Sequence, residues 1–144
     1  MPTGKITKIT SDRGGFLVQI TGVAVPLVAT SQAVQSALLT AFLAPAEVTI
    51  ELFDNSAAIK RVDAFDVNKK ATNGQISRLA TQLNVGLGLN VLEVFVIAGG
   101  IETALQANDG VIQQVCCCAA LSKAKVDLTL NVTEITRVSF PAPA

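Results

Sequence analysis

The chain has 144 residues, enough for one domain or two small units, and half of them are hydrophobic, so a substantial core can form. Charged residues make up only 15%, and 11 basic side chains balance 11 acidic ones, which disfavours nucleic acid as a partner because phosphate binding needs excess positive charge. His, Trp and Tyr are absent, which excludes imidazole catalysis, histidine metal ligands and stacking platforms made of Trp or Tyr.

Residues 1–66 have the alternating pattern of a small sheet. Phe16, Val18 and Ile20 share one face at a period of two, and turn-forming residues precede them. The expected elements are strands over 5–10, 16–20 and 23–27, then a helix, then strands over 47–53 and 57–65. This β-β-β-α-β-β order predicts a small antiparallel sheet or barrel within an α+β fold.

The helix of this unit has clear start and stop signals. Ser31 is a typical N-cap, and Pro45 must end the helix because proline cannot continue it. Val34, Leu38 and Phe42 recur at a spacing of four and are expected to form its buried stripe.

Residues 67–125 are expected to form an apolar helical section that serves oligomerisation. Thr72 and Gln75 have the spacing of a capping box, which predicts an amphipathic helix over 76–83. Further helical pieces are expected over 92–98 and 101–107. Whether residues 84–110 are one continuous helix stays open, because glycines interrupt them.

A last helix is expected over 111–121, with Asp109 as its cap. It contains Cys116, Cys117 and Cys118, which are consecutive and cannot form a disulfide framework among themselves. Free cysteine is often buried, and these thiols lack a histidine that would lower their pKa. We expect buried, unreactive side chains.

Residues 126–144 are expected to return to the first sheet as a C-terminal strand. Apolar and polar side chains alternate without a fault over 126–132, which is typical of a strand with one buried face. The pattern changes face over 133–135, which predicts a bulge before the strand continues to Phe140.

The interval from Arg78 to Lys123 contains no other basic residue, and helices that are apolar nearly all round are typical of subunit interfaces. The predicted oligomer interface comprises Leu83, Leu87, Val91, Val94, Phe95, Val111, Val115 and Cys118. The leading hypothesis is a non-enzymatic, self-associating structural or adaptor subunit of a homo-oligomeric assembly, with a phage or virus particle as one such assembly. Its partners are then other copies of itself and other subunits of that assembly.

Two other functions compete with this hypothesis. A membrane-active or pore-forming protein would insert the apolar helical hairpin, although the polar residues in that section oppose insertion. A nucleic-acid-binding small barrel would use a basic patch made of Lys60, Arg61, Lys69 and Lys70.

We expect no enzyme, because no motif places a catalytic residue, a cofactor-binding residue or a metal ligand. Glu93 and Glu102 are nine positions apart, and nothing in the sequence holds them together as a carboxylate pair. The first 15 residues contain no apolar run of signal-peptide length. The expected location is therefore the cytoplasm or the interior of an assembled particle.

Overall fold

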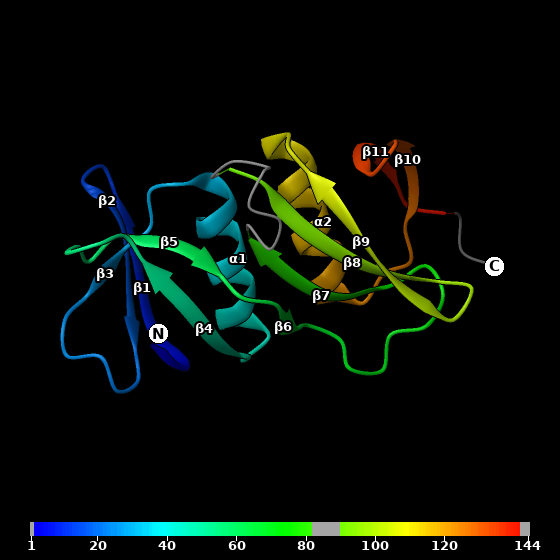
Figure 1. Ribbon diagram of the computed structural model, residues 1–144. Helices are drawn as coiled ribbons and strands as arrows, with labels where there is room; N and C mark the ends of the chain where they lie inside the picture. The colour runs from blue at the N-terminus through cyan, green and yellow to red at the C-terminus, as the bar shows by residue number, and fades with distance from the viewer. Residues whose placement is uncertain (1, 82–89, 142–144) are drawn as a thin grey trace.

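The computed structural model describes residues 2–81 and 90–141. Within them the chain forms two helices and eleven strands, arranged in two sheets (Figure 1). The prediction of an α+β fold is confirmed. Neither sheet closes into a barrel among the described residues, because each sheet has two end strands.

The first sheet is antiparallel and has the order β3-β2-β1-β4-β5. Its strands are β1 (Thr3–Asp12), β2 (Gly15–Ile20), β3 (Leu27–Val28), β4 (Glu47–Leu52) and β5 (Ile59–Val62). Helix α1 (Gln32–Leu43) lies between β3 and β4 in the sequence, so the predicted β-β-β-α-β-β order is confirmed. Ser31 caps α1 as expected, since its side chain accepts from the backbone N–H of Val34.

The second sheet is mixed and has the order β10-β11-β9-β8-β7-β6. Its strands are β6 (Phe65–Asp66), β7 (Ile76–Thr81), β8 (Leu92–Ala98), β9 (Ile101–Ala107), β10 (Asp127–Asn131) and β11 (Glu134–Ser139). Helix α2 (Gly110–Ser122) joins β9 to β10 and begins at the predicted cap, Asp109. The Asp109 carboxylate accepts from the backbone N–H groups of Val111 and Ile112 at 2.9 and 3.1 Å.

The prediction of a helical section before α2 is wrong. Strand β7 covers the described part of the expected helix at 76–83, and β8 and β9 form a hairpin where two helical pieces were expected. The physical reason is burial on both faces of β8, because Val94 and Phe95 point to opposite sides and are both buried. A strand covered on both sides loses the alternation that identifies it, and its short apolar run then also fits a helix.

One of the two bonds expected of a capping box forms at Thr72 and Gln75, although no helix follows it: the side chain of Gln75 reaches back, but its N–H does not bond the Thr72 hydroxyl. The backbone N–H of Thr72 donates to Oε1 of Gln75 at 2.8 Å, while the N–H of Gln75 donates to the carbonyl of Thr72. These bonds close a turn that leads into β7. The side chain of Gln75 therefore makes its predicted bond to the N–H of Thr72, but within a turn and not at the start of a helix.

The prediction that the C-terminal residues return to the first sheet as a single strand is also wrong. They form the β10–β11 hairpin, and β11 pairs with β9 of the second sheet in parallel. The hairpin turns at Val132, whose φ of 59° is one that β-branched residues avoid. Both residues of the turn, Val132 and Thr133, are β-branched, so the sequence at the turn itself does not mark the reversal.

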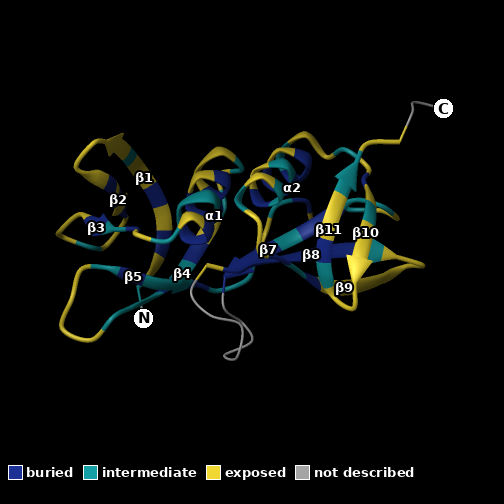
Figure 2. Cartoon of the chain, turned by 90° about the horizontal axis from the view of Figure 1, so that it is seen from above, coloured by how far each residue is buried: buried dark blue, intermediate teal, exposed yellow. Residues whose placement is uncertain are grey.

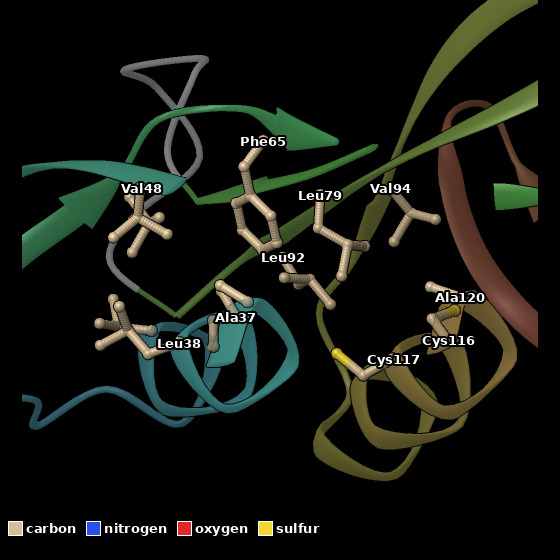
Figure 3. Close-up of a cluster of buried hydrophobic side chains, with 14 of the residues drawn as sticks. Ala37, Leu38, Val48, Phe65, Leu79, Leu92, Val94, Cys116, Cys117 and Ala120 are labelled. Carbon is tan, nitrogen blue, oxygen red and sulfur yellow. The ribbon is translucent and has the colours of Figure 1, made fainter. Parts of the chain in front are cut away.

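One core joins both sheets and both helices. The helices lie side by side on the same side of the sheets, as Figures 1 and 2 show from two directions. In Figure 3, Ala37 and Leu38 of α1 lie near Val48, while Cys116 and Ala120 of α2 lie on the side of Val94. These inward positions of the helices are mostly small, which lets the helices lie close to the sheets.

Leu79 lies fully buried on β7 in the centre of this core (Figure 3). We expect Leu79→Ala to lower the free energy of unfolding by about 2–5 kcal/mol, because the cavity adds to the lost burial. Urea unfolding followed by circular dichroism would measure the change. Leu17→Ala on β2, where the side chain is 39% exposed, is the matched control and should cost much less. Equal losses in the two variants would contradict the central position of Leu79.

Candidate functional site

The outward side of both helices is the most unusual surface of the chain. Neither α1 nor α2 contains a charged residue. A helix on the surface of a monomer usually carries charges on its solvent side. Here that side carries apolar side chains, which we call the helical face: Leu39, Phe42, Leu43, Val111 and Cys118. Leu43 and Val111 are 56% and 68% exposed, so large apolar groups stand in solvent.

A groove runs between the two helices within this face. Its volume is about 150 Å³, and four residues of each helix line it. The lining residues are Ser36, Leu39, Thr40 and Leu43 from α1, and Gln114, Cys117, Cys118 and Leu121 from α2. The hydroxyl of Thr40 donates to the carbonyl of Ser36 at 2.7 Å, so this polar group already has a partner inside α1. The groove therefore suits an apolar side chain better than a polar substrate.

A polar network that is partly buried holds the first turns of the two helices together. Oδ1 of Asn90 accepts from the backbone N–H of Ala33 at 2.9 Å, next to the Ser31 cap. Gln113 is fully buried in α2, and its Nε2 donates to the carbonyls of Asn90 and Ala107, both at 2.9 Å. Because breaking a buried bond leaves a polar group unsatisfied, this network fixes α2 relative to α1. The helical face is thus a preformed surface.

The three cysteines differ in their surroundings. Burial raises the pKa of Cys116 to about 12, and the neighbouring Cys117 adds to the rise. Burial also raises the pKa of Cys117 to about 11, although a contact with Thr40 opposes it. The expectation of a buried thiol is confirmed for these two residues and is wrong for Cys118, which is exposed on the helical face.

The predicted oligomer interface is only partly available at the surface. Two of its members, Val111 and Cys118, are exposed on the helical face, and Val115 is half-buried in α2. Three members are buried within the chain: Val91, Val94 and Phe95. Two members, Leu83 and Leu87, lie outside the described residues. That these positions form an interface stays a prediction.

The part of the helical face that α1 contributes was not predicted from the sequence. Phe42 was assigned to the buried stripe but is 38% exposed, because Ala41 takes the inward position beside Leu38. Leu39 and Leu43 lie on the same outward side as Phe42. The sequence does contain a signal for this exposed surface: α1 has no charged residue, and it carries a second apolar stripe opposite the one that is rich in alanine.

The predicted basic patch is divided by the fold. Nε of Arg61 lies 2.7 Å from a carboxylate oxygen of Glu51, so its charge is paired. Lys69 and Lys70 are exposed beyond the end of β6. Lys69 lines a hollow of about 500 Å³ whose charged side chains are two lysines and two carboxylates: Lys5, Lys69, Glu47 and Asp66. This balance of charge gives the hollow no positive excess for phosphate.

Glu93 and Glu102 do not form a carboxylate pair. Glu93 lies opposite Gln106 in the β8–β9 register, whereas Glu102 lies opposite Ile97, four residues further along β8. Glu102 instead binds Arg78, with its Oε1 accepting from Nη2 at 2.6 Å and from Nε at 3.1 Å. This contact links β7 to β9.

Arg78 and Glu102 have further partners on the same surface. The guanidinium of Arg78 lies 4.5 Å from the ring centre of Phe95 on the intervening β8. Ser77 donates to the other oxygen of Glu102 at 2.7 Å. These contacts engage Nε and Nη2 of the arginine and both oxygens of the carboxylate, so the cluster ties three strands together.

Two further features bear on the competing functions. The apolar helical hairpin that a membrane-active role required is the β8–β9 hairpin followed by α2. In the described part of the chain, no helix is long and apolar enough to cross a membrane. In the same part, no three side chains of His, Cys, Asp or Glu lie close enough to hold a metal ion.

Comparisons with protein-family models, with curated proteins and with solved structures find no match to this chain. The geometry of the helical face and its chemistry therefore carry the functional conclusion. That chemistry is mainly apolar contact, because the groove presents no charged side chain and the Thr40 hydroxyl is bonded within α1, which leaves Ser36 and Gln114 as its other polar side chains.

Cysteine labelling tests the environment of α2. At pH 8 and low protein concentration, we expect one thiol per chain to react rapidly with DTNB, because pKa values of about 12 and 11 leave Cys116 and Cys117 protonated. Cys118→Ser should abolish this rapid phase while the protein stays folded. Rapid reaction of three thiols in the folded protein would show that α2 is not packed as described.

The contact between Arg78 and Glu102 makes stability depend on pH. The pKa of Glu102 lies below its ordinary value of 4.5. The largest cause is the hydrogen bond from Arg78, and the hydrogen bond from Ser77 is the second. The carboxylate therefore stabilises the folded state above pH 4.5, and this contribution is lost as the pH falls through the lower folded pKa. We expect Glu102→Gln to cost at most about 1 kcal/mol at pH 7, because the pair is partly exposed. Urea unfolding at pH 7 and pH 3 should give a smaller pH dependence in the variant, and an unchanged dependence would contradict the assignment.

Proposed function

We propose that the chain is a non-enzymatic, self-associating structural or adaptor subunit whose helical face packs against the helical face of a second copy. The observation that carries the proposal is the row of exposed apolar side chains on two helices without charge. Exposed apolar surface of this kind marks sites of association, since leaving it in water is unfavourable.

Self-complementarity favours a second copy as the occupant. In a contact with two-fold symmetry the same surface of each copy meets the other. A charge near the symmetry axis would then lie close to the identical charge of the second copy, unless the surface also carried an opposite charge to pair with it. The helical face has no charge, and it therefore meets itself without repulsion. It also offers both a groove and the ridges, such as Leu39 and Leu43, that fill a groove in helix packing.

The size of the helical face sets the scale of this contact. Helices of 12 and 13 residues are about 18–20 Å long, and two of them side by side are about 20 Å wide. The projected area is roughly 400 Å² for each subunit, modest beside the roughly 800 Å² that each partner of a standard interface buries. A stable assembly therefore gains from an additional contact elsewhere on the chain.

The mass of the protein in solution tests this proposal. Light scattering on a sizing column should show a multimer for the unmodified chain. Val111→Lys should weaken association by about 30-fold or more, because it places a like charge on both surfaces of a contact that excludes water. Ile101→Lys at the tip of the β8–β9 hairpin is the matched control, since Ile101 is 69% exposed and Val111 is 68% exposed.

The control variant should retain the mass of the unmodified protein, and both variants should keep the same circular dichroism spectrum. A monomeric unmodified protein across the accessible concentration range would refute self-association. Equal masses for Val111→Lys and the unmodified protein would remove the helical face from the contact.

A further inference from the structure

Strand β10 is an end strand of the second sheet. The residues just before it are paired, since the N–H of Val126 donates to the carbonyl of Gly74 at 2.9 Å and Lys125 bridges Gln75, whereas no described strand pairs with the open side of Asp127–Asn131. End strands in natural proteins are usually protected against pairing by lysine, proline or a very short length. The five residues of β10 include neither lysine nor proline. Leu130 on this strand is 43% exposed, and Val132, just after it, is 90% exposed. The β10–β11 hairpin lies at the end of the molecule opposite β2 and β3, as Figures 1 and 2 both show.

The sequence of this edge is nearly palindromic about Thr129. Residues 126–132 read Val-Asp-Leu-Thr-Leu-Asn-Val, and the reverse order differs only by the exchange of aspartate and asparagine. Within β10 (Asp127–Asn131), two copies aligned antiparallel about Thr129 place leucine opposite leucine and threonine opposite threonine. The two valines lie outside the strand and add no pair to the ladder, because Val132 is in the turn and the N–H of Val126 is bonded to Gly74. The remaining pair is Asp127 opposite Asn131, so no charge faces a like charge, and the amide can donate to the carboxylate.

The backbone of β10 has the orientation that this register needs. The carbonyls of Asp127 and Thr129 accept from the hydroxyls of Ser139 at 3.5 Å and Thr136 at 3.1 Å, so both point toward β11. Backbone groups alternate in direction along an antiparallel strand, so Leu128 and Leu130 turn theirs to the open side. Alignment about Thr129 puts Leu128 of one copy opposite Leu130 of the other. These are the residues with groups free to bond.

The apolar side chains on this edge also match. Leu128 is half-buried against the core, and Leu130 shares its face of the sheet but is exposed at the rim. In the antiparallel alignment each exposed Leu130 lies beside the Leu128 of the other copy. The two cores would then be continuous across the junction, and Leu130 would be covered.

We propose that β10 pairs antiparallel with β10 of a second copy of this chain, with Thr129 opposite Thr129, and joins two six-stranded sheets edge to edge. This contact deepens the proposed self-association because it names a second surface with the same kind of partner. It uses no residue of the helical face, so either contact can fail without the other.

Disulfide cross-linking tests the register directly, in a Cys118→Ser background that leaves only the two buried thiols. Thr129→Cys should form a covalent dimer on mild oxidation, because a non-hydrogen-bonded antiparallel pair has Cα atoms about 4.5 Å apart, within reach of a disulfide. Asp127→Cys alone should not, because its copies would lie about 13 Å apart along the strands. A mixture of Asp127→Cys and Asn131→Cys should form the heterodimer.

Leu130→Pro provides a second test that does not involve sulfur. The N–H of Leu130 points to the open side, so proline removes bonds between copies and none to β11. In the Thr129→Cys background it should slow cross-linking about tenfold or more, because two backbone bonds are lost across the dimer. Circular dichroism checks that the variant is folded.

The outcomes separate this contact from the helical face. Cross-linking of Thr129→Cys that persists with Val111→Lys would support the β10 contact by itself. Absence of cross-linking in purified Thr129→Cys would overturn the proposal. That result is also expected if the partner of β10 is a different protein. Cross-linking of Asp127→Cys alone at the rate of Thr129→Cys would equally overturn it, because random collision would then explain both.

Discussion

The packing of α1 beside α2 is the contact on which the rest of the structure depends. Helix α1 touches strands of both sheets, including β5 of the first and β7 of the second, while α2 packs on β7, β9 and β11. The two sheets share no ladder among the described residues, and they are joined by the helices and by a direct contact in which the N–H of Val62 on β5 donates to the hydroxyl of Thr81 on β7 at 2.7 Å. The bonds from Gln113 to Asn90 and Ala107 keep the helices at one relative position. The core, the groove and the helical face all follow from that arrangement.

The first half of the fold could be predicted from the sequence, and much of the second half could not. In β2, Phe16, Val18 and Ile20 alternate with exposed residues, so one face is dry and the periodicity is plain. In β8 five consecutive residues are buried, which removes the periodicity and leaves helix and strand equally compatible with the pattern. The hairpin at Val132 was hidden for a different reason, since valine is a residue that such turns rarely use.

The candidate site shows a similar division. Val111 and Cys118 were identified because α2 is apolar on more than one side. The contribution of α1 was missed because this helix has large apolar side chains on both sides. Val34 and Leu38 face the core beside three alanines, while Leu39, Phe42 and Leu43 face out. Periodicity indicates which residues share a face of a helix. Which apolar face is buried depends on the space between the helix and the sheets, and that space cannot be predicted from a sequence pattern. The edge of β10 is visible in the sequence as a palindrome, yet its exposure depends on the strand order.

The absence of charge on both helices also determines how a contact between helical faces responds to its surroundings. An association without charged groups has little Coulomb energy to screen, so moderate salt should hardly weaken it. Burial of apolar surface instead carries a negative change in heat capacity, and its driving force near room temperature is mainly entropic. Such a contact loses strength on cooling. Cold, rather than ionic strength, would then separate two copies joined by the proposed contact.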